Sequence, residues 1–155
     1  MREFVSDQRV TEYVCQRTGI RLGQDHSCLG IVRDGVVLGG VVFTHFSGTD
    51  VSITVAVSSP RVFTKQFLIR VGQYIFSELR VSRVTILTEQ PAVVEFALRR
   101  GAKIEGIKRD AFGPGRNATM LGLLASEWPF REAKRLRPVS SRSDMHGIRP
   151  RRPNA

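Results

Sequence analysis

Residues 51–88 constrain the fold more than any other part of the sequence, because a strand pattern, a helix pattern and a second strand pattern follow one another there. In VSITVAV, residues 51–57, β-branched side chains alternate with small ones, which is typical of a strand with two different faces. Apolar residues then recur at helical spacing over residues 62–79, and RVTILT, residues 83–88, has the composition of a buried strand. This succession predicts a βαβ unit, whose right-handed crossover makes the two strands parallel.

The connection between the first of these strands and the helix, residues 58–66, is predicted to bind an anion. The first turn of a helix has backbone N–H groups without helical partners and lies at the positive end of the helix dipole, so it attracts phosphate groups. Beside this connection, Ser52, Thr54 and Ala56 leave one face of the strand small. That face has room for something to lie against the strand.

A hairpin is predicted before the βαβ unit. Asp34-Gly35 separates two apolar runs, and this dipeptide is a strong signal for a two-residue turn between strands. Gly39 and Gly40 in the second run predict a bulge or a close approach of another segment to the backbone. A further turn at residues 47–50 leads into the next strand, so three antiparallel strands are expected before the crossover helix.

Helices are predicted on either side of these strands. Ser6 or Asp7 is suited to cap a first helix, and Gly19 is suited to end it. A later helix is expected over residues 91–101, because a proline suits its first turn and a glycine its end. The residues that follow form two strand patterns joined around Gly-Pro-Gly at 113–115, which predicts a closing hairpin.

The positive charge of the chain is concentrated at its C-terminus. Residues 131–155 contain eight of the 24 Lys and Arg residues but two of the 14 acidic residues, and the formal net charge of the whole chain is +10. We expect a folded domain over residues 1–130 and a basic, flexible extension over residues 131–155. No apolar run is long enough to span a membrane, so a cytoplasmic protein without membrane contact is expected. Cys15 and Cys28 lack metal-ligand spacing and are expected to be reduced, without a metal site.

One segment carries a family resemblance. ALRRGAKIEGIKR, residues 97–109, is followed by a strand pattern that ends at Glu127-Trp128. Together with the order of predicted elements, this segment resembles the GCN5-related N-acetyltransferase family, in particular the ribosomal-protein N-terminal acetyltransferases and the small acetyltransferase-like proteins of tailed bacteriophages. The resemblance covers residues 22–128, and the matching residues within the segment are Gly101, Glu105, Gly106 and Arg109.

The resemblance implies an α/β fold with a mixed sheet, in which antiparallel strands precede a βαβ unit with a splayed parallel pair and a hairpin closes the sheet. It also implies transfer of an acyl group from acetyl-CoA, bound as a co-substrate, to the amine of a protein or small molecule. The backbone of the first parallel strand would hold the pantetheine arm, and the following loop and the next helix would hold the rest of the cofactor. The cofactor-binding residues implied in this way are Val55, Ala56, Val57, Arg61, Phe63, Thr64, Lys65, Gln66 and Gln90.

The cofactor loop departs from the family pattern. Members of the family usually have Gly or Ala at two positions where the backbone approaches the pyrophosphate, and Thr64 and Gln66 stand there in this chain. Arg61 and Lys65 are then expected to contribute side-chain charge, or else to be ordinary solvated residues. Phe63 is interpreted as a core residue or as a platform for adenine.

Four residues are candidates for the chemistry, which needs an uncharged amine, a donor for the oxyanion and a proton for the leaving thiolate. Asp50 and His45 are expected at adjoining strand ends, where either can act as the base directly or through water. The alternative roles are a turn-capping Asp and a hydrogen-bonded structural His. Ser52 and Thr54 either line a groove and donate a proton or only keep their face small. The tyrosine that protonates the thiolate in many members falls at Ala97.

The filled loop positions and the missing tyrosine also favour a second hypothesis from a different class. In it, the acetyltransferase-like fold is a catalytically weak or inactive binding module, for example one that engages and modulates a host enzyme. A third hypothesis is association with nucleic acid through the basic residues 131–155.

Overall fold

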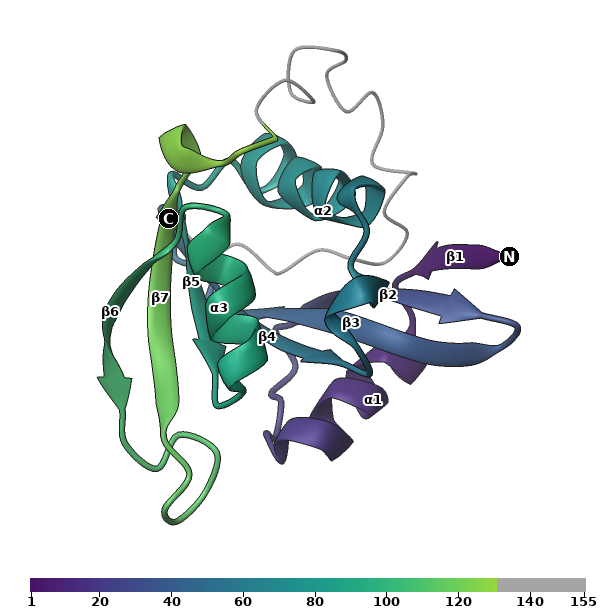
Figure 1. The fold of residues 1–155 in the computed structure, drawn as a ribbon, viewed down its shortest axis with the longest axis horizontal. Coiled ribbons are helices and arrows are strands. Elements are labelled where there is room, and N and C mark those ends of the chain that lie inside the picture. The colour runs from purple at the N-terminus through teal and green to yellow at the C-terminus, as the bar shows by residue number, and fades with distance from the viewer. Residues whose placement is uncertain (131–155) are drawn as a thin grey trace.

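The computed structural model describes residues 1–130, and the predicted basic extension lies outside the described residues. Figure 1 shows a strongly twisted sheet with helices on both of its faces. The elements in chain order are β1 (Arg2–Val5), α1 (Gln8–Thr18), β2 (Ser27–Arg33), β3 (Val36–Thr44), β4 (Asp50–Val57), the 3₁₀ turn η1 (Pro60–Val62), α2 (Lys65–Gly72), the π-helical turn η2 (Gln73–Glu78), β5 (Arg83–Thr88), α3 (Pro91–Arg99), β6 (Lys103–Lys108), β7 (Ala118–Leu124) and the 3₁₀ turn η3 (Ala125–Glu127).

The seven strands form one mixed sheet in the order β1-β2-β3-β4-β5-β7-β6. β4 and β5 are the parallel pair, and every other neighbouring pair is antiparallel. The expected mixed α/β fold, with a βαβ unit after antiparallel strands and a closing hairpin, is therefore confirmed. β1 was not predicted from the sequence.

The hairpin between β2 and β3 has the turn that its sequence predicts. Asp34 and Gly35 both have positive φ, 51° and 80°, as a two-residue turn that matches the strand twist requires. The register shifts between Ile31 and Val32, which places the expected bulge in this hairpin. The close approach is also present, since a Cβ added at Gly40 would lie 2.5 Å from Cγ1 of Val10 in α1.

The crossover helix begins later than its hydrophobic pattern indicated. Ser59 and Pro60 start η1, and the α-helix begins at Lys65, with the Thr64 side chain accepting a hydrogen bond from the N–H of Phe67. A proline at the first position favours this short turn because its fixed φ suits it. The predicted start near residue 62 is therefore wrong, whereas the helix itself and its buried face are confirmed.

α2 and α3 pack on one face of the sheet, and α1 packs on the other. Val51, Ile53 and Val55 of β4 belong to the larger core with α2 and α3. Ala56, on the opposite face, is fully buried in a smaller core that α1 forms with β2, β3 and β4. The room beside the small face of β4 is thus filled by α1 at Ala56, and the expectation of an open groove at that side chain is wrong.

Candidate functional site

The site is organised by the separation of the two parallel strands. β4 and β5 pair from Asp50–Arg83 as far as Thr54–Leu87. Beyond that point, residues 55–57 of β4 pair with β3 alone, and the end of β5 pairs with β7. Figure 1 shows the two strands running in clearly different directions. A strand edge with backbone groups that no neighbouring strand uses is available for a ligand on the β5 side of β4.

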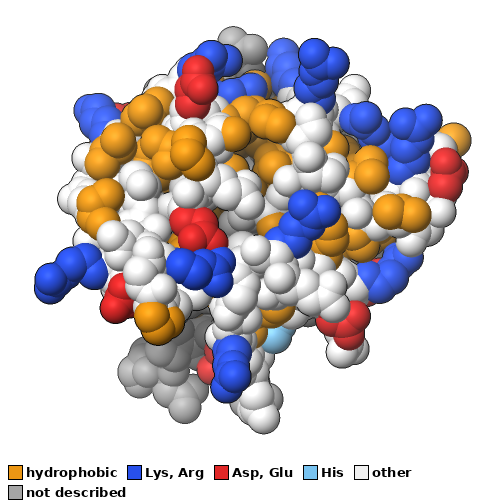
Figure 2. All heavy atoms as spheres, turned by 60° about the horizontal axis from the view of Figure 1, so that its bottom comes forward, with side chains coloured by type: hydrophobic (Ala, Val, Ile, Leu, Met, Phe, Trp, Pro, Cys, Tyr) orange, Lys and Arg blue, Asp and Glu red, His pale blue; other side chains and the backbone are white. Residues whose placement is uncertain are grey.

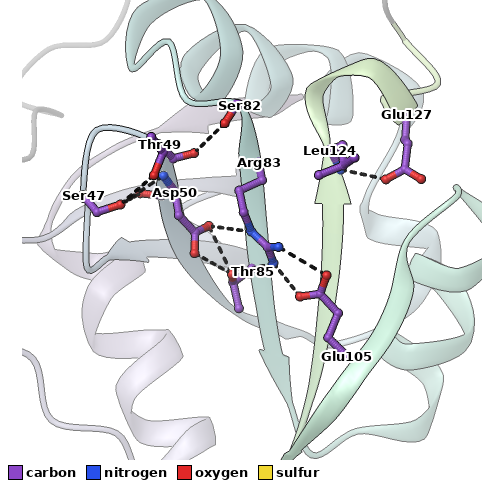
Figure 3. A network of polar contacts seen from close by, with 9 residues as sticks. All are labelled: Ser47, Thr49, Asp50, Ser82, Arg83, Thr85, Glu105, Leu124 and Glu127. Carbon is purple, nitrogen blue, oxygen red and sulfur yellow. Dashed lines mark hydrogen bonds and ion pairs between the residues drawn. The ribbon is translucent and has the colours of Figure 1, made fainter.

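At the other end, the two strands are held together by charged side chains (Figure 3). The Asp50 carboxylate accepts hydrogen bonds from the Thr85 hydroxyl at 2.8 and 3.1 Å and lies 3.5 Å from Nε of Arg83. Arg83 also donates two hydrogen bonds to Glu105, at 2.5 and 3.2 Å. The hydrogen bond from Arg83 lowers the pKa of Glu105 below its ordinary value. Asp50 is therefore part of an ion-pair network that joins β4, β5 and β6.

Gly122 makes this network possible, because β7 lies between β5 and β6. A Cβ at position 122 would collide with the Glu105 carboxylate. The register between β6 and β7 shifts between Ile104 and Gly106, so Glu105 occupies a bulge and its side chain crosses above β7. Glu105 therefore has a structural role in this geometry.

A groove of about 990 Å³ opens on the α1 side of the sheet where β4 and β5 separate. Thr54 and Leu87 line it, together with residues 19–25, 44–46, 108 and 111–113. His45 lies in this lining and is exposed, and its Nδ1 is 3.0 Å from the Thr44 hydroxyl. Of the four candidate catalytic residues, the structure brings His45 and Thr54 into the groove, whereas Ser52 and Asp50 do not line it.

An apolar cavity of about 90 Å³ lies on the opposite face, between β4, β5, the β4–α2 loop, α2 and α3. Its lining is apolar apart from Arg100, whose guanidinium stacks 3.4 Å above the Phe96 ring and donates to the Phe96 carbonyl. Burial lowers the pKa of Arg100. Figure 2 shows hydrophobic side chains gathered around a hollow in the surface, with Lys and Arg nearby. Val55, Val57 and Phe63 of the predicted cofactor set line the cavity.

The loop predicted to bind phosphate uses most of its own backbone donors. The N–H groups of residues 61–64 donate to groups within the loop, and those of Phe67 and Leu68 donate to Thr64. The N–H groups of Ser59, Lys65 and Gln66 remain available, so fewer are free than the sequence suggested. Arg61 and Lys65 are exposed, and within residues 1–130 neither has a carboxylate within 4.0 Å.

The remaining predicted residues lie around these features. Gln66 is exposed in the first turn of α2, and Gln90 immediately precedes α3, where its N–H donates to the Thr88 hydroxyl at 3.1 Å. Phe63 is buried and stacks on Phe67 with ring centroids 5.1 Å apart, which places it in the core. Ala97 lines the apolar cavity instead of the groove.

The sequence did not reveal the groove's outer walls. Arg116 donates to the carbonyls of Thr18 and Phe112 at 3.0 and 3.1 Å and pairs with Glu89. It thereby fixes the β6–β7 loop against the end of α1. Thr18 and Arg116 are 98 positions apart, and a single arginine in a loop gives no local signal of such a partner.

Two further findings concern the described residues as a whole. Within residues 1–130, no three His, Cys, Asp or Glu side chains are grouped so that they can hold a metal ion. No helix in this part of the chain is long and apolar enough to cross a membrane.

Comparisons with known proteins give similarity in structure alone. No protein-family model matches the sequence, and no curated protein is significantly similar to it. A dodecameric structure of spermidine N-acetyltransferase from Vibrio cholerae is 11% identical, with a TM-score of 0.62 and coverage of 84% of this chain and 97% of that chain. Mutant forms of the spermidine/spermine N-acetyltransferase from the same organism are also 11% identical, with a TM-score of 0.60. That similarity covers 84% of this chain and 99% of that chain.

A protein described as a probable acetyltransferase is also similar, at 19% identity and a TM-score of 0.55, over 79% of this chain and 71% of that chain. At these identities, the comparisons show the fold. The chain has the fold of the GCN5-related N-acetyltransferases, as the resemblance implied.

Proposed function

We propose that this protein is an acyl-CoA-dependent N-acyltransferase that acetylates the amine of a protein or small molecule. The observation that carries the proposal is the way neighbouring residues divide between two faces where the parallel strands separate. Thr54 and Leu87 line the groove, whereas Val55 and Ile86, next to them in sequence, line the apolar cavity. Because successive strand residues point to opposite faces, the two spaces lie on opposite sides of the sheet beside the point where the strands separate.

This arrangement suits a thioester donor and an amine acceptor that approach from opposite sides of the sheet. The pantetheine arm would lie along residues 55–57 with its carbonyl at the groove, where the acceptor enters. The neutral amine attacks that carbonyl, a C–N bond forms, and the C–S bond then breaks to release the CoA thiolate. The amine loses a proton in the course of the reaction, and the thiolate gains one.

His45 is the proposed base, because it lines the groove and is exposed. Thr54 also lines the groove, and its hydroxyl is the proposed proton donor to the thiolate or the proposed hydrogen-bond partner of the acceptor. Ser52 is assigned to packing, since its neighbours across the sheet are Thr44 and Thr85. Asp50 is assigned to the ion-pair network and acts on the site only through the position of β4.

The proposed activity is tested by the release of CoA thiol from acetyl-CoA with a panel of amines. The panel includes polyamines, amino acids and peptides with free N-termini, because the resemblance to N-terminal acetyltransferases and phage proteins leaves a protein acceptor open. Acceptor-dependent thiol release that is lost in His45→Gln supports the proposal. If acetyl-CoA neither binds at millimolar concentration nor releases thiol with any amine, the protein is not this enzyme.

A second candidate function is a protein-binding modulator with little or no catalysis. The loop favours it, since the residues at positions 64 and 66 are not small and most of the loop N–H groups are already bonded. CoA binding without turnover, together with a partner that remains bound to the His45→Gln protein, would support this function instead.

A further inference from the structure

The β4–α2 loop has few backbone donors to offer a diphosphate. Val62 donates to the Ser59 carbonyl at 3.0 Å, Phe63 to Pro60 at 3.3 Å, and Thr64 to Val62 at 2.9 Å. The Arg61 N–H donates to the Ser59 hydroxyl at 3.4 Å. A phosphate could use these N–H groups only if the loop's own bonds were broken, and unpaired backbone groups are costly to leave buried.

The helix that follows adds little more. The Thr64 side chain accepts from the N–H of Phe67 at 3.2 Å, so the cap residue already occupies one of the first-turn donors. Within residues 58–66, these bonds leave the N–H groups of Ser59, Lys65 and Gln66, and the last two residues lie in an exposed turn. Charge from the side chains of Arg61 and Lys65 acts in solvent, where ion pairs contribute little and are screened by salt.

The pantetheine arm, which is the uncharged part of the donor, has more contacts available to it than the nucleotide has. The edge of β4 at residues 55–57 has no β5 partner and offers backbone groups to the two amides of a pantetheine arm. Val57, Pro60, Val93 and Phe96 line an apolar cavity of about 90 Å³ beside that edge, which suits the two methyl groups of the arm. Hydrogen-bonding and apolar contacts therefore coincide at the pantetheine and not at the nucleotide.

We infer that this chain recognises its acyl donor through the pantetheine arm and gains little affinity from the nucleotide. Pantetheine thioesters that lack the adenosine and its phosphates are then accepted as donors, whatever group replaces the nucleotide. The inference rests on the proposed function, since it names the donor class of the same site. In this chain, hydrogen bonds within the β4–α2 loop replace contacts to a diphosphate.

Calorimetric titration of three ligands tests the inference without knowledge of the acceptor. The ligands are CoA, pantetheine and adenosine 3′,5′-bisphosphate. We expect the dissociation constant of pantetheine to be within about thirtyfold of that of CoA, because two exposed charge contacts contribute no more than this. We expect the bisphosphate to bind at least about a hundredfold more weakly than pantetheine. If CoA binds and pantetheine binds more than about thirtyfold more weakly, the inference is wrong while the proposed function stands. If neither CoA nor pantetheine binds, the proposed function fails as well.

Variants locate the contacts. Ala92 is exposed and lines the cavity, so Ala92→Trp is expected to block it and to weaken CoA and pantetheine by the same factor, at least about tenfold. Leu98→Trp is the matched control, because Leu98 is exposed on the same helix and does not line the cavity. Unchanged pantetheine binding in Ala92→Trp would overturn the assignment of the arm to this cavity.

The double variant Arg61→Ala and Lys65→Ala separates the nucleotide from the arm. It is expected to lower the affinity for CoA to that of pantetheine and to leave pantetheine binding unchanged. A loss of more than about a hundredfold for CoA would show that the nucleotide dominates binding, contrary to the inference. Thermal melts of all variants verify that each one is folded.

Discussion

The two ends of the β4–β5 pair differ although the strands are the same. At one end, here called the closed end, Asp50, Arg83 and Glu105 link three strands through hydrogen bonds and ion pairs. At the other end, the open end, the pairing stops at Thr54–Leu87 and the strands separate between an apolar cavity and a groove. We propose that one end of this strand pair stabilises the fold and the other binds the ligand.

The separation follows from the partners that each strand keeps. β4 stays paired with β3 as far as Val57, and the N–H of Ser58 continues this contact by donating to the Leu38 carbonyl. β5 stays paired with β7 as far as Thr88–Thr119. Because a twisted sheet rotates each strand relative to the next, two strands that follow different outer neighbours diverge. The charged network at the other end prevents the same divergence there.

The largest expected effect is a difference in kcat between substitutions at the two ends of the strand pair. Replacing His45 with Gln at the open end should lower kcat by about a hundredfold, since a positioned general base contributes at least this much. The free energy of unfolding should change by no more than about 0.5 kcal/mol, because His45 is exposed.

Asp50→Asn is the matched variant at the closed end, and its kcat should fall by no more than about fivefold, because its role is to position β4. Steady-state thiol release and urea unfolding measure both quantities. A hundredfold loss in Asp50→Asn, with normal activity in His45→Gln, would place the base at the closed end.

Removal of the central cation should destabilise the closed end. In Arg83→Met, Asp50 and Glu105 lose their shared partner, and the free energy of unfolding should fall by about 2 kcal/mol, between the values for exposed and buried pairs. Arg99→Met is the control, because Arg99 pairs with Glu95 on the surface and should contribute at most about 0.5 kcal/mol. Urea titrations give both values. Equal losses of unfolding free energy in the two variants would show that the network stabilises the fold no more than a surface ion pair does.

A smaller effect is expected at Gly122, where the Glu105 side chain crosses β7. Gly122→Ala should displace the Glu105 side chain and cost about 1 kcal/mol, the usual contribution of such an ion pair. In a Glu105→Ala background, the same substitution should cost nothing, because no side chain remains to be displaced. A double-mutant cycle by urea unfolding measures the difference. An unchanged cost in that background would mean that Gly122 is required for another reason.

The smallest expected effect is on the pH dependence of stability. The hydrogen bond from Arg83 lowers the pKa of Glu105 in the folded state, so its stabilisation is complete above the unfolded pKa of about 4.3. It is lost as the pH falls through the lower folded value. The difference in unfolding free energy between the wild type and Glu105→Gln should therefore be constant from about pH 7 to pH 5 and shrink at lower pH. A difference that grows on acidification would contradict the assigned sign.

The order of elements could be predicted because its signals are local. Alternation in residues 51–57, the Asp34-Gly35 turn and the capping residue Asp7 each act over a few positions, and the structure shows all three. β1 could not be predicted, since its four residues have no buried face and are held by pairing with β2.

The candidate site could be predicted only in part. His45 was selected because it lies near the end of a predicted strand and Thr54 because it lies on the small face of one, and both line the groove. Asp50 was selected because it lies at a predicted strand end, but its partners Thr85 and Arg83 are more than 30 positions away and give no local signal. The bonds within the cofactor loop also escaped prediction, because they depend on how η1 folds after Ser59.

The central claim is that the open end of the parallel pair binds the donor. The most direct test is a titration of CoA into ¹⁵N-labelled protein, followed by the backbone amide resonances. We predict that the largest shifts occur in residues 55–57 and 86–88 and in the first turns of α3, while Asp50, Arg83, Glu105 and Gly122 do not change. Shifts that are largest at the closed end, or a titration that leaves residues 55–57 unaffected, would contradict the account.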